Sequence, residues 1–171
     1  MRKDKMFMVM RPGGWYDTKG KTCLSAHEIE LVNAQAEKIF PYAEGLKSIA
    51  ISSSDPLAMH TADILNSKIG LEKEIFDILL SDLLEDLNIV TSYMYDKLFI
   101  KDYAVAIVVA HAQIAENLLS HFCNSKFNTN MVCCDLGRAC GNMVLFNRNG
   151  SKDNEYTPSK IYYMGSKDEG Y

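Results

Sequence analysis

The chain has 171 residues, of which 47% are hydrophobic, and this is enough material for one domain with a substantial core. Its net charge of −4 and pI of about 5.5 exclude a protein that binds nucleic acid through a basic surface, because such a surface must neutralise phosphates. We therefore expect a single domain over residues 1–171 and no nucleic-acid partner.

The first predicted elements are a strand and a helix. Residues 6–10 form an unbroken apolar run that stops at a Pro-Gly-Gly sequence, as a buried strand of a parallel sheet does. Ser25 and Glu28 have the spacing of a capping box, and apolar residues recur at helical intervals after them. This pattern predicts a helix that begins after Ser25 and ends at Pro41.

A second strand and helix follow in the same order. Residues 48–52 predict a short strand, and Asp55 and Pro56 have the residue types that cap and open a helix, here expected to reach about Lys68. The next stretch, residues 71–103, has leucines at helical spacing and is interpreted as a mostly helical insert. Residues 75–80 within it could equally form a short strand.

The last part of the chain predicts three more strands. The apolar run 104–109 leads to His111, which opens a helix with apolar residues on one face. Residues 142–146 and 160–164 are strand-like, and a polar loop over about 147–159 separates them.

Strands that alternate with helices predict an α/β protein, a three-layer α/β/α sandwich with a mainly parallel sheet. Ligand sites in such sheets lie at the carboxyl ends of the strands. Arg11, the serines at 52–54 and His111 all follow predicted strands, so we expect them at this edge.

No membrane span, metal site or cofactor site is predicted. The run 6–10 is too short for a membrane helix or a signal peptide. The cysteines are odd in number and lack the paired spacing of zinc sites; they are Cys23, Cys123, Cys133, Cys134 and Cys140. We expect reduced thiols, no bound metal or cofactor, and a cytoplasmic protein.

Three stretches of the sequence resemble the motifs of one family. They are Met10-Arg11-Pro12-Gly13, the segment from Ser52 to Ala62 (SSSDPLAMHTA), and Val108-Val109-Ala110-His111-Ala112. In this order, over about residues 6–125, they resemble the arginine-histidine-glycine motif, the serine-rich motif and the second histidine of the histidine phosphatase (phosphoglycerate mutase-like) superfamily. The resemblance implies a phosphoglycerate mutase-like fold and a phosphohydrolase that acts through a phosphohistidine.

Two departures from the family pattern argue against that chemistry. Pro12 stands where the family has its nucleophilic histidine, and a proline ring has no lone pair for attack on phosphorus. Leu57 stands where the family has a second phosphate-binding arginine, and it can neither pair with charge nor donate a hydrogen bond. The resemblance therefore implies a degenerate member, with no confident catalytic residue.

Three residues remain as candidates for binding an anion: Arg11, Gly13 and His111. Arg11 is a cation, Gly13 lets a ligand approach the backbone closely, and His111 supplies an imidazole. His60 lies one helical turn after Leu57 and is a candidate replacement nucleophile, while Glu85 is the candidate acid. The alternative interpretations are structural. Arg11 would pair with a carboxylate such as Asp17, Asp55 or Glu85, and the histidines would be ordinary helix or backbone-bonded residues.

The leading hypothesis is an inactive histidine phosphatase-like protein that binds a small anion or phosphorylated ligand in a regulatory role. The first alternative is a phosphatase of altered mechanism, acting on a phosphorylated protein or a small phosphoester. The second is a structural or assembly subunit, for instance a homodimer, suggested by the leucine-rich stretch 71–100.

Overall fold

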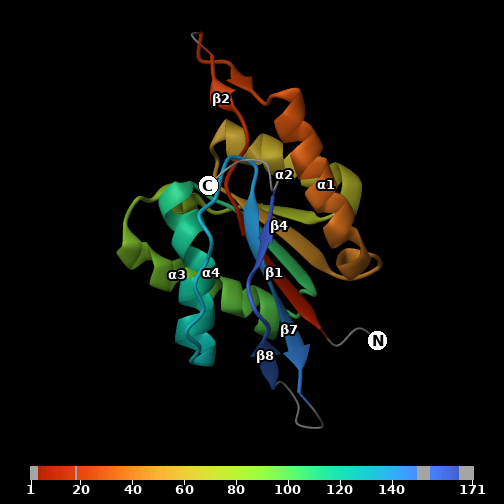
Figure 1. Ribbon diagram of the computed structural model, residues 1–171, viewed down its shortest axis with the longest axis vertical. Helices are drawn as coiled ribbons and strands as arrows, with labels where there is room; N and C mark the ends of the chain where they lie inside the picture. Colours follow the sequence, from red (N-terminus) through yellow and green to blue (C-terminus); the bar gives the residue numbers. More distant parts are fainter. Residues whose placement is uncertain (1–3, 18, 150–154, 166–171) are drawn as a thin grey trace.

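The computed structural model describes residues 4–17, 19–149 and 155–165, which build a central sheet with helices on both faces (Figure 1). The strands of the sheet are β1 (Lys5–Met10), β4 (Ser48–Ser52), β5 (Glu72–Ile75), β6 (Val105–Val109), β7 (Gly141–Arg148), β8 (Tyr156–Pro158) and β9 (Tyr162–Met164). The α-helices are α1 (Ala26–Ala43), α2 (Pro56–Ile69), α3 (Leu87–Tyr95) and α4 (Ala112–Phe127). The predicted α/β class and layered architecture are confirmed.

The strand order is β5-β4-β6-β1-β7-β8, and β9 also pairs with β7. The neighbours among β5, β4, β6 and β1 are parallel, whereas β7 pairs antiparallel with β1, β8 and β9. The sheet is therefore mixed, although a mainly parallel one was predicted. After α4, residues 128–140 form an irregular segment, and β7 then starts with Gly141 beside Met10, at the carboxyl end of β1.

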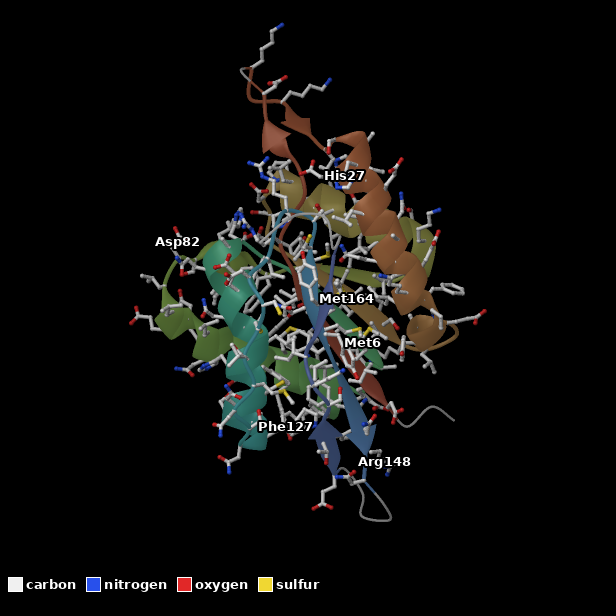
Figure 2. All side chains as sticks on the ribbon, in the orientation of Figure 1. Met6, His27, Asp82, Phe127, Arg148 and Met164 are labelled. Carbon is white, nitrogen blue, oxygen red and sulfur yellow. The ribbon has the colours of Figure 1, made fainter. Side chains whose placement is uncertain are left out.

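Residues 128–140, called the return segment below, explain this change of direction. In a standard βαβ unit the helix delivers the chain to the amino end of the next strand. Here α4 runs the length of the sheet, and Figure 2 shows its last residue, Phe127, at the opposite end of the molecule from His27. The return segment brings the chain back to the carboxyl ends before β7 begins.

The two faces of the sheet bury separate apolar clusters, because side chains alternate along each strand. Phe7 and Val9 point toward α3 and α4, while Met6, Met8 and Met10 point toward α1 and α2. All of β1 is buried, which is why its sequence is almost continuously apolar.

The predicted helix starts are confirmed by their caps. The Ser25 hydroxyl accepts from the backbone N–H of Glu28, and the Glu28 carboxylate accepts from the backbone N–H of Ser25. Asp55 caps α2 through its side-chain oxygen. Pro41 lies inside α1, which ends at Ala43, so the predicted end was two residues early. Ala43 is buried against the core, and this packing favours continuing the helix past the proline.

The prediction for residues 71–103 was wrong at its start. Residues 72–75 form the edge strand β5, followed by the short 3₁₀ helices η1 (Asp77–Leu80) and η2 (Leu84–Asp86). Helix α3 and the π-helical η3 (Asp96–Ile100) complete the stretch. The edge strand is stabilised from one face by Tyr103 and Lys97, which bond to Glu72 and Glu74.

The sequence analysis missed the small hairpin β2 (Trp15–Tyr16) and β3 (Thr22–Cys23). It turns through Asp17, whose side chain accepts from the backbone N–H groups of Lys19 and Lys21. The predicted polar loop is shorter than expected, because β7 and β8 enter it from both sides, and residues 150–154 lie outside the described residues. Among the described residues, no helix is both long and apolar enough to cross a membrane.

Candidate functional site

The carboxyl ends of β1, β4 and β6 coincide at one edge of the sheet. Met10 of β1 and Ser52 of β4 are both in register with Val109 of β6. The backbone of Ala110 continues the pairing by donating to the carbonyl of Met10. Arg11 and His111 therefore leave neighbouring strands at the same edge, and this region is the candidate site.

The Arg11 side chain bonds within the protein. Its Nη1 donates to the carbonyl of Leu136 at 2.8 Å and lies 3.9 Å from Oε1 of Glu116. The pairing partner is thus Glu116 on α4, which was not among the carboxylates considered from the sequence. The Arg11 backbone N–H donates to the carbonyl of Cys140. The return segment therefore contacts the candidate site through Arg11.

The backbone after Arg11 is also engaged. Pro12 has no N–H, and its carbonyl accepts from Ala139 at 3.4 Å. The Gly13 N–H donates to Oγ1 of Thr61 at 3.0 Å. A Cβ at Gly13 would lie 3.2 Å from the Leu24 side chain and 3.3 Å from Cβ of Ala139, so a larger residue would require these neighbours to shift slightly. An anion that used the Gly13 amide would have to replace Thr61.

Glu28 contributes a buried carboxylate at this end of the sheet. Burial alone would raise the pKa of Glu28. This effect is outweighed by hydrogen bonds from the backbone N–H groups of Ser25 and Gly14 and from the Ser25 hydroxyl, together with the positive charge of Arg138. The net effect is a lowered pKa for Glu28. Gly14 has a φ of 89°, which only glycine adopts readily. The carboxylate thus holds the Gly13-Gly14 turn against α1.

His111 is the N-cap residue of α4, with an extended backbone and no capping hydrogen bond from its side chain. Its Nε2 is buried and has no hydrogen-bond partner among the described residues. An unpaired buried nitrogen is unusual, because it costs the hydration it has lost. The position at a helix N-terminus also favours an anionic neighbour. His111 is the candidate residue with the clearest unused binding capacity.

On α2, the side chain that faces the candidate site is Thr61, not His60. Leu57 is 8% exposed, and its carbonyl accepts from the Thr61 hydroxyl at 2.8 Å. His60 is exposed. The expected one-turn relation between Leu57 and His60 fails here, because the residue four positions after Leu57 continues the buried face. The threonine was part of the quoted motif, but its contact with Gly13 was not predicted.

Glu85 lies in η2 and is exposed, outside the contacts that gather around Arg11. Figure 2 places its neighbour Asp82 at the outer side of the molecule. Both residues are exposed, as expected of a solvated surface segment. Arg138 in the return segment is exposed, but its charge acts on Glu28.

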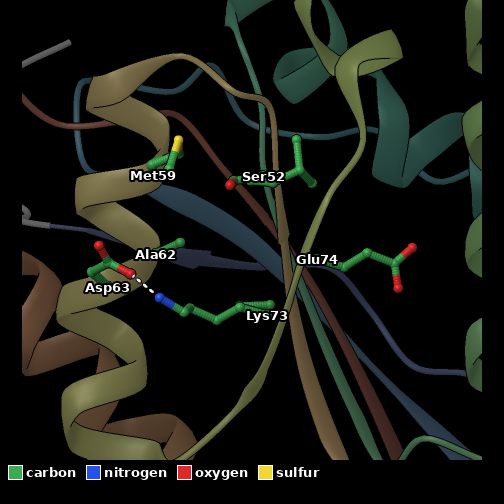
Figure 3. Close-up of a pocket in the computed structure, with 8 residues that line it drawn as sticks. Ser52, Met59, Ala62, Asp63, Lys73 and Glu74 are labelled. Atoms are coloured by element: carbon green, nitrogen blue, oxygen red, sulfur yellow. Dashed lines mark hydrogen bonds and ion pairs between the residues drawn. The ribbon is translucent and has the colours of Figure 1, made fainter.

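The serines at 52–54 make contacts with residues other than Arg11. Ser52 lines a cavity of about 220 Å³ between α2 and β5, together with Met59, Ala62 and Ile75, and the Lys73–Asp63 ion pair crosses it (Figure 3). The Ser53 hydroxyl accepts from the backbone of Asp55, and the Ser54 N–H donates to Asp77. In the described part of the chain, no group of three His, Cys, Asp or Glu residues is placed to hold a metal ion.

Solved structures of phosphatases and of a mutase share this architecture. The protein histidine phosphatase SixA, in a complex with tungstate, has a TM-score of 0.66 at 15% identity, over 94% of this chain and 96% of its own. Phosphoglycerate mutase from Plasmodium falciparum has a TM-score of 0.56 at 11% identity, over 99% and 98% of the two chains. The fold is that of the histidine phosphatases.

A mycobacterial glucosyl-3-phosphoglycerate phosphatase has the same histidine phosphatase fold, with a TM-score of 0.52 at 15% identity over 84% of this chain and 91% of its own. No family model and no curated protein matches the sequence. At these identities the likeness establishes the fold, while chemistry depends on the residues at the site.

Proposed function

We propose that this protein has the histidine phosphatase fold without the phosphohistidine chemistry, and that it binds a small anion or a phosphorylated ligand beside Arg11 and His111. The observation that carries the proposal is Pro12, which directly follows Arg11 at the carboxyl end of β1. The family resemblance assigns the nucleophile to this position. Loss of the nucleophile in covalent catalysis typically lowers the rate by about a millionfold.

Two features support retention of a binding role. Arg11 supplies a permanent cation at the strand end, with its side chain 31% exposed. His111 supplies a buried nitrogen, at the N-terminus of a 16-residue helix, that has no hydrogen-bond partner in the part of the chain that the structure describes. Both groups favour an anion, and they leave adjacent strands.

The same contacts predict weak binding. Leu136 accepts a hydrogen bond from Arg11, and Thr61 accepts one from Gly13. A ligand must replace these internal partners, and Leu57 provides no second cation on α2. We expect a dissociation constant for inorganic phosphate of about 1 mM, well above that of a complete phosphate site.

The test has an activity arm and a binding arm. The full chain is assayed with an aryl phosphate and with a phosphohistidine peptide, and turnover at background is expected. Phosphate is then titrated while backbone amide shifts are followed by NMR. Arg11→Ala should abolish saturable shifts near residues 11 and 111, whereas Lys68→Ala, which removes one exposed positive charge on α2, should not. Binding that is unchanged in Arg11→Ala contradicts the proposal.

A phosphatase of altered mechanism is the second candidate, because the unpartnered Nε2 of His111 is itself a potential nucleophile. It predicts turnover above background that disappears in His111→Ala and a phosphorylated His111 after rapid quench. Turnover that also disappears in His60→Ala would assign a role to the exposed histidine. Either result would contradict the proposal that the protein is inactive.

A further inference from the structure

Glu116 is an acidic residue in the immediate surroundings of Arg11. It lies on α4, five residues after His111, and its side chain is 35% exposed. Its Oε1 lies 3.9 Å from Nη1 of Arg11, and the same nitrogen donates to Leu136 at 2.8 Å. The cation that would bind an anion therefore has a carboxylate beside it.

The Glu116 carboxylate has capacity for another partner. A separation of 3.9 Å is an ion pair but is too long for a hydrogen bond. Across residues 4–17, 19–149 and 155–165, no hydrogen bond satisfies its oxygens. An ionised carboxylate can accept several hydrogen bonds, so a donor from a ligand would find unoccupied acceptors.

A simple dianion is poorly matched to this pair, because attraction to Arg11 is opposed by repulsion from Glu116. A ligand with an anionic group for Arg11 and a neighbouring cationic group for Glu116 is complementary to both charges. His111 Nε2 lies buried at the start of the same helix and can serve the anionic group as a donor.

We propose that Glu116 makes the Arg11 site selective for zwitterionic ligands, in which a phosphoryl or other anionic group lies close to an ammonium or similar cation. The inference rests on the proposed anion-binding function and names its ligand class. Glu116 acts as a specificity-determining residue, and no bond is made or broken.

The probes are O-phosphoethanolamine and ethyl phosphate, which differ chiefly in one ammonium group. Dissociation constants are measured on the full chain by NMR titration at constant ionic strength. The wild type should prefer O-phosphoethanolamine by about twofold to fivefold, the range of a partly exposed charge pair. Glu116→Gln should bind ethyl phosphate more tightly and O-phosphoethanolamine more weakly, so that the preference disappears.

Glu37→Gln is the matched control, because it removes the same charge from an exposed position on α1. It should leave the preference unchanged. Glu116→Asp keeps the charge and should retain part of the preference, which separates charge from a folding defect. Equal binding of both probes by wild type and Glu116→Gln overturns the selectivity but leaves anion binding intact. Absence of binding of either probe by every variant overturns the proposed function as well.

Discussion

The hydroxyl of Thr61 joins two structural elements. It accepts from the Gly13 N–H at 3.0 Å and donates to the Leu57 carbonyl at 2.8 Å, and both bonds are buried. Thr61→Val keeps the shape but leaves the Gly13 N–H without a partner, which should cost about 1–3 kcal/mol. Urea unfolding measures the loss.

Thr61→Ser is the matched variant, since it keeps the hydroxyl and removes only a methyl group. The exchange of the Gly13 amide with solvent should accelerate in Thr61→Val and remain slow in Thr61→Ser. Equal protection of this amide in the two variants would show that the hydrogen bond contributes little.

Glu28 predicts a pH dependence of stability. In the folded protein the pKa of Glu28 is lowered from the ordinary value of 4.5. Burial would raise the pKa, but the hydrogen bonds from Ser25 and Gly14 and the charge of Arg138 have the larger effect. A carboxyl with a lowered folded pKa stabilises the protein above its unfolded pKa, and this stabilisation is lost as pH falls through the folded value. Glu28→Gln should therefore be less stable than wild type at pH 7. The difference should shrink below pH 4.5 in urea unfolding across a pH series. A difference that stays constant with pH contradicts this assignment.

Helix α2 begins after the serines at 52–54, and the side chain of Asp55 caps its first turn. Oδ1 of Asp55 accepts from the backbone N–H groups of Leu57 and Ala58 at 2.9 and 3.1 Å. Asp55→Ala should lower the unfolding free energy by about 1 kcal/mol, and Asp55→Ser should restore most of it. Asp63→Ala on the same helix breaks only the half-exposed pair with Lys73 and should cost less. Equal losses in Asp55→Ala and Asp63→Ala would exclude a special role for the cap.

Elements with local signals were predictable from the sequence. Strands β1, β4 and β6 are apolar runs, and capping residues in the sequence mark the first turns of α1 and α2. Strand β5 was not predictable, because Glu72, Lys73 and Glu74 carry charge on both faces of an edge strand. Its stabilising partners, Tyr103 and Lys97, lie far along the chain.

In the candidate site too, some features could be predicted from the local sequence and others depend on tertiary contacts. Arg11 and His111 were placed correctly at one edge, because parallel strands end together and each residue directly follows an apolar run. Contacts that depend on tertiary packing were not predicted. Glu116 and Leu136 reach Arg11 only because α4 begins, and the return segment ends, at this edge of the sheet. No local pattern in the return segment predicts that path, since it lacks hydrophobic periodicity.

At the scale of the whole molecule, a ligand that binds only the folded chain must raise its stability. With a dissociation constant of about 1 mM, 10 mM phosphate should stabilise the fold by about 1.4 kcal/mol and raise the Tm by about 3–6 °C. Phosphate also stabilises proteins by exclusion from their surface, so the raw shift is not diagnostic.

The diagnostic quantity is the difference between wild type and Arg11→Ala in the same buffers. Exclusion acts on the whole surface and is equal in both proteins, whereas specific binding requires the guanidinium that lies between Leu136 and Glu116. The wild-type shift should therefore exceed the Arg11→Ala shift and saturate with phosphate concentration. Parallel, unsaturated shifts in the two proteins would mean that phosphate acts on the surface in general and that Arg11 serves the fold alone.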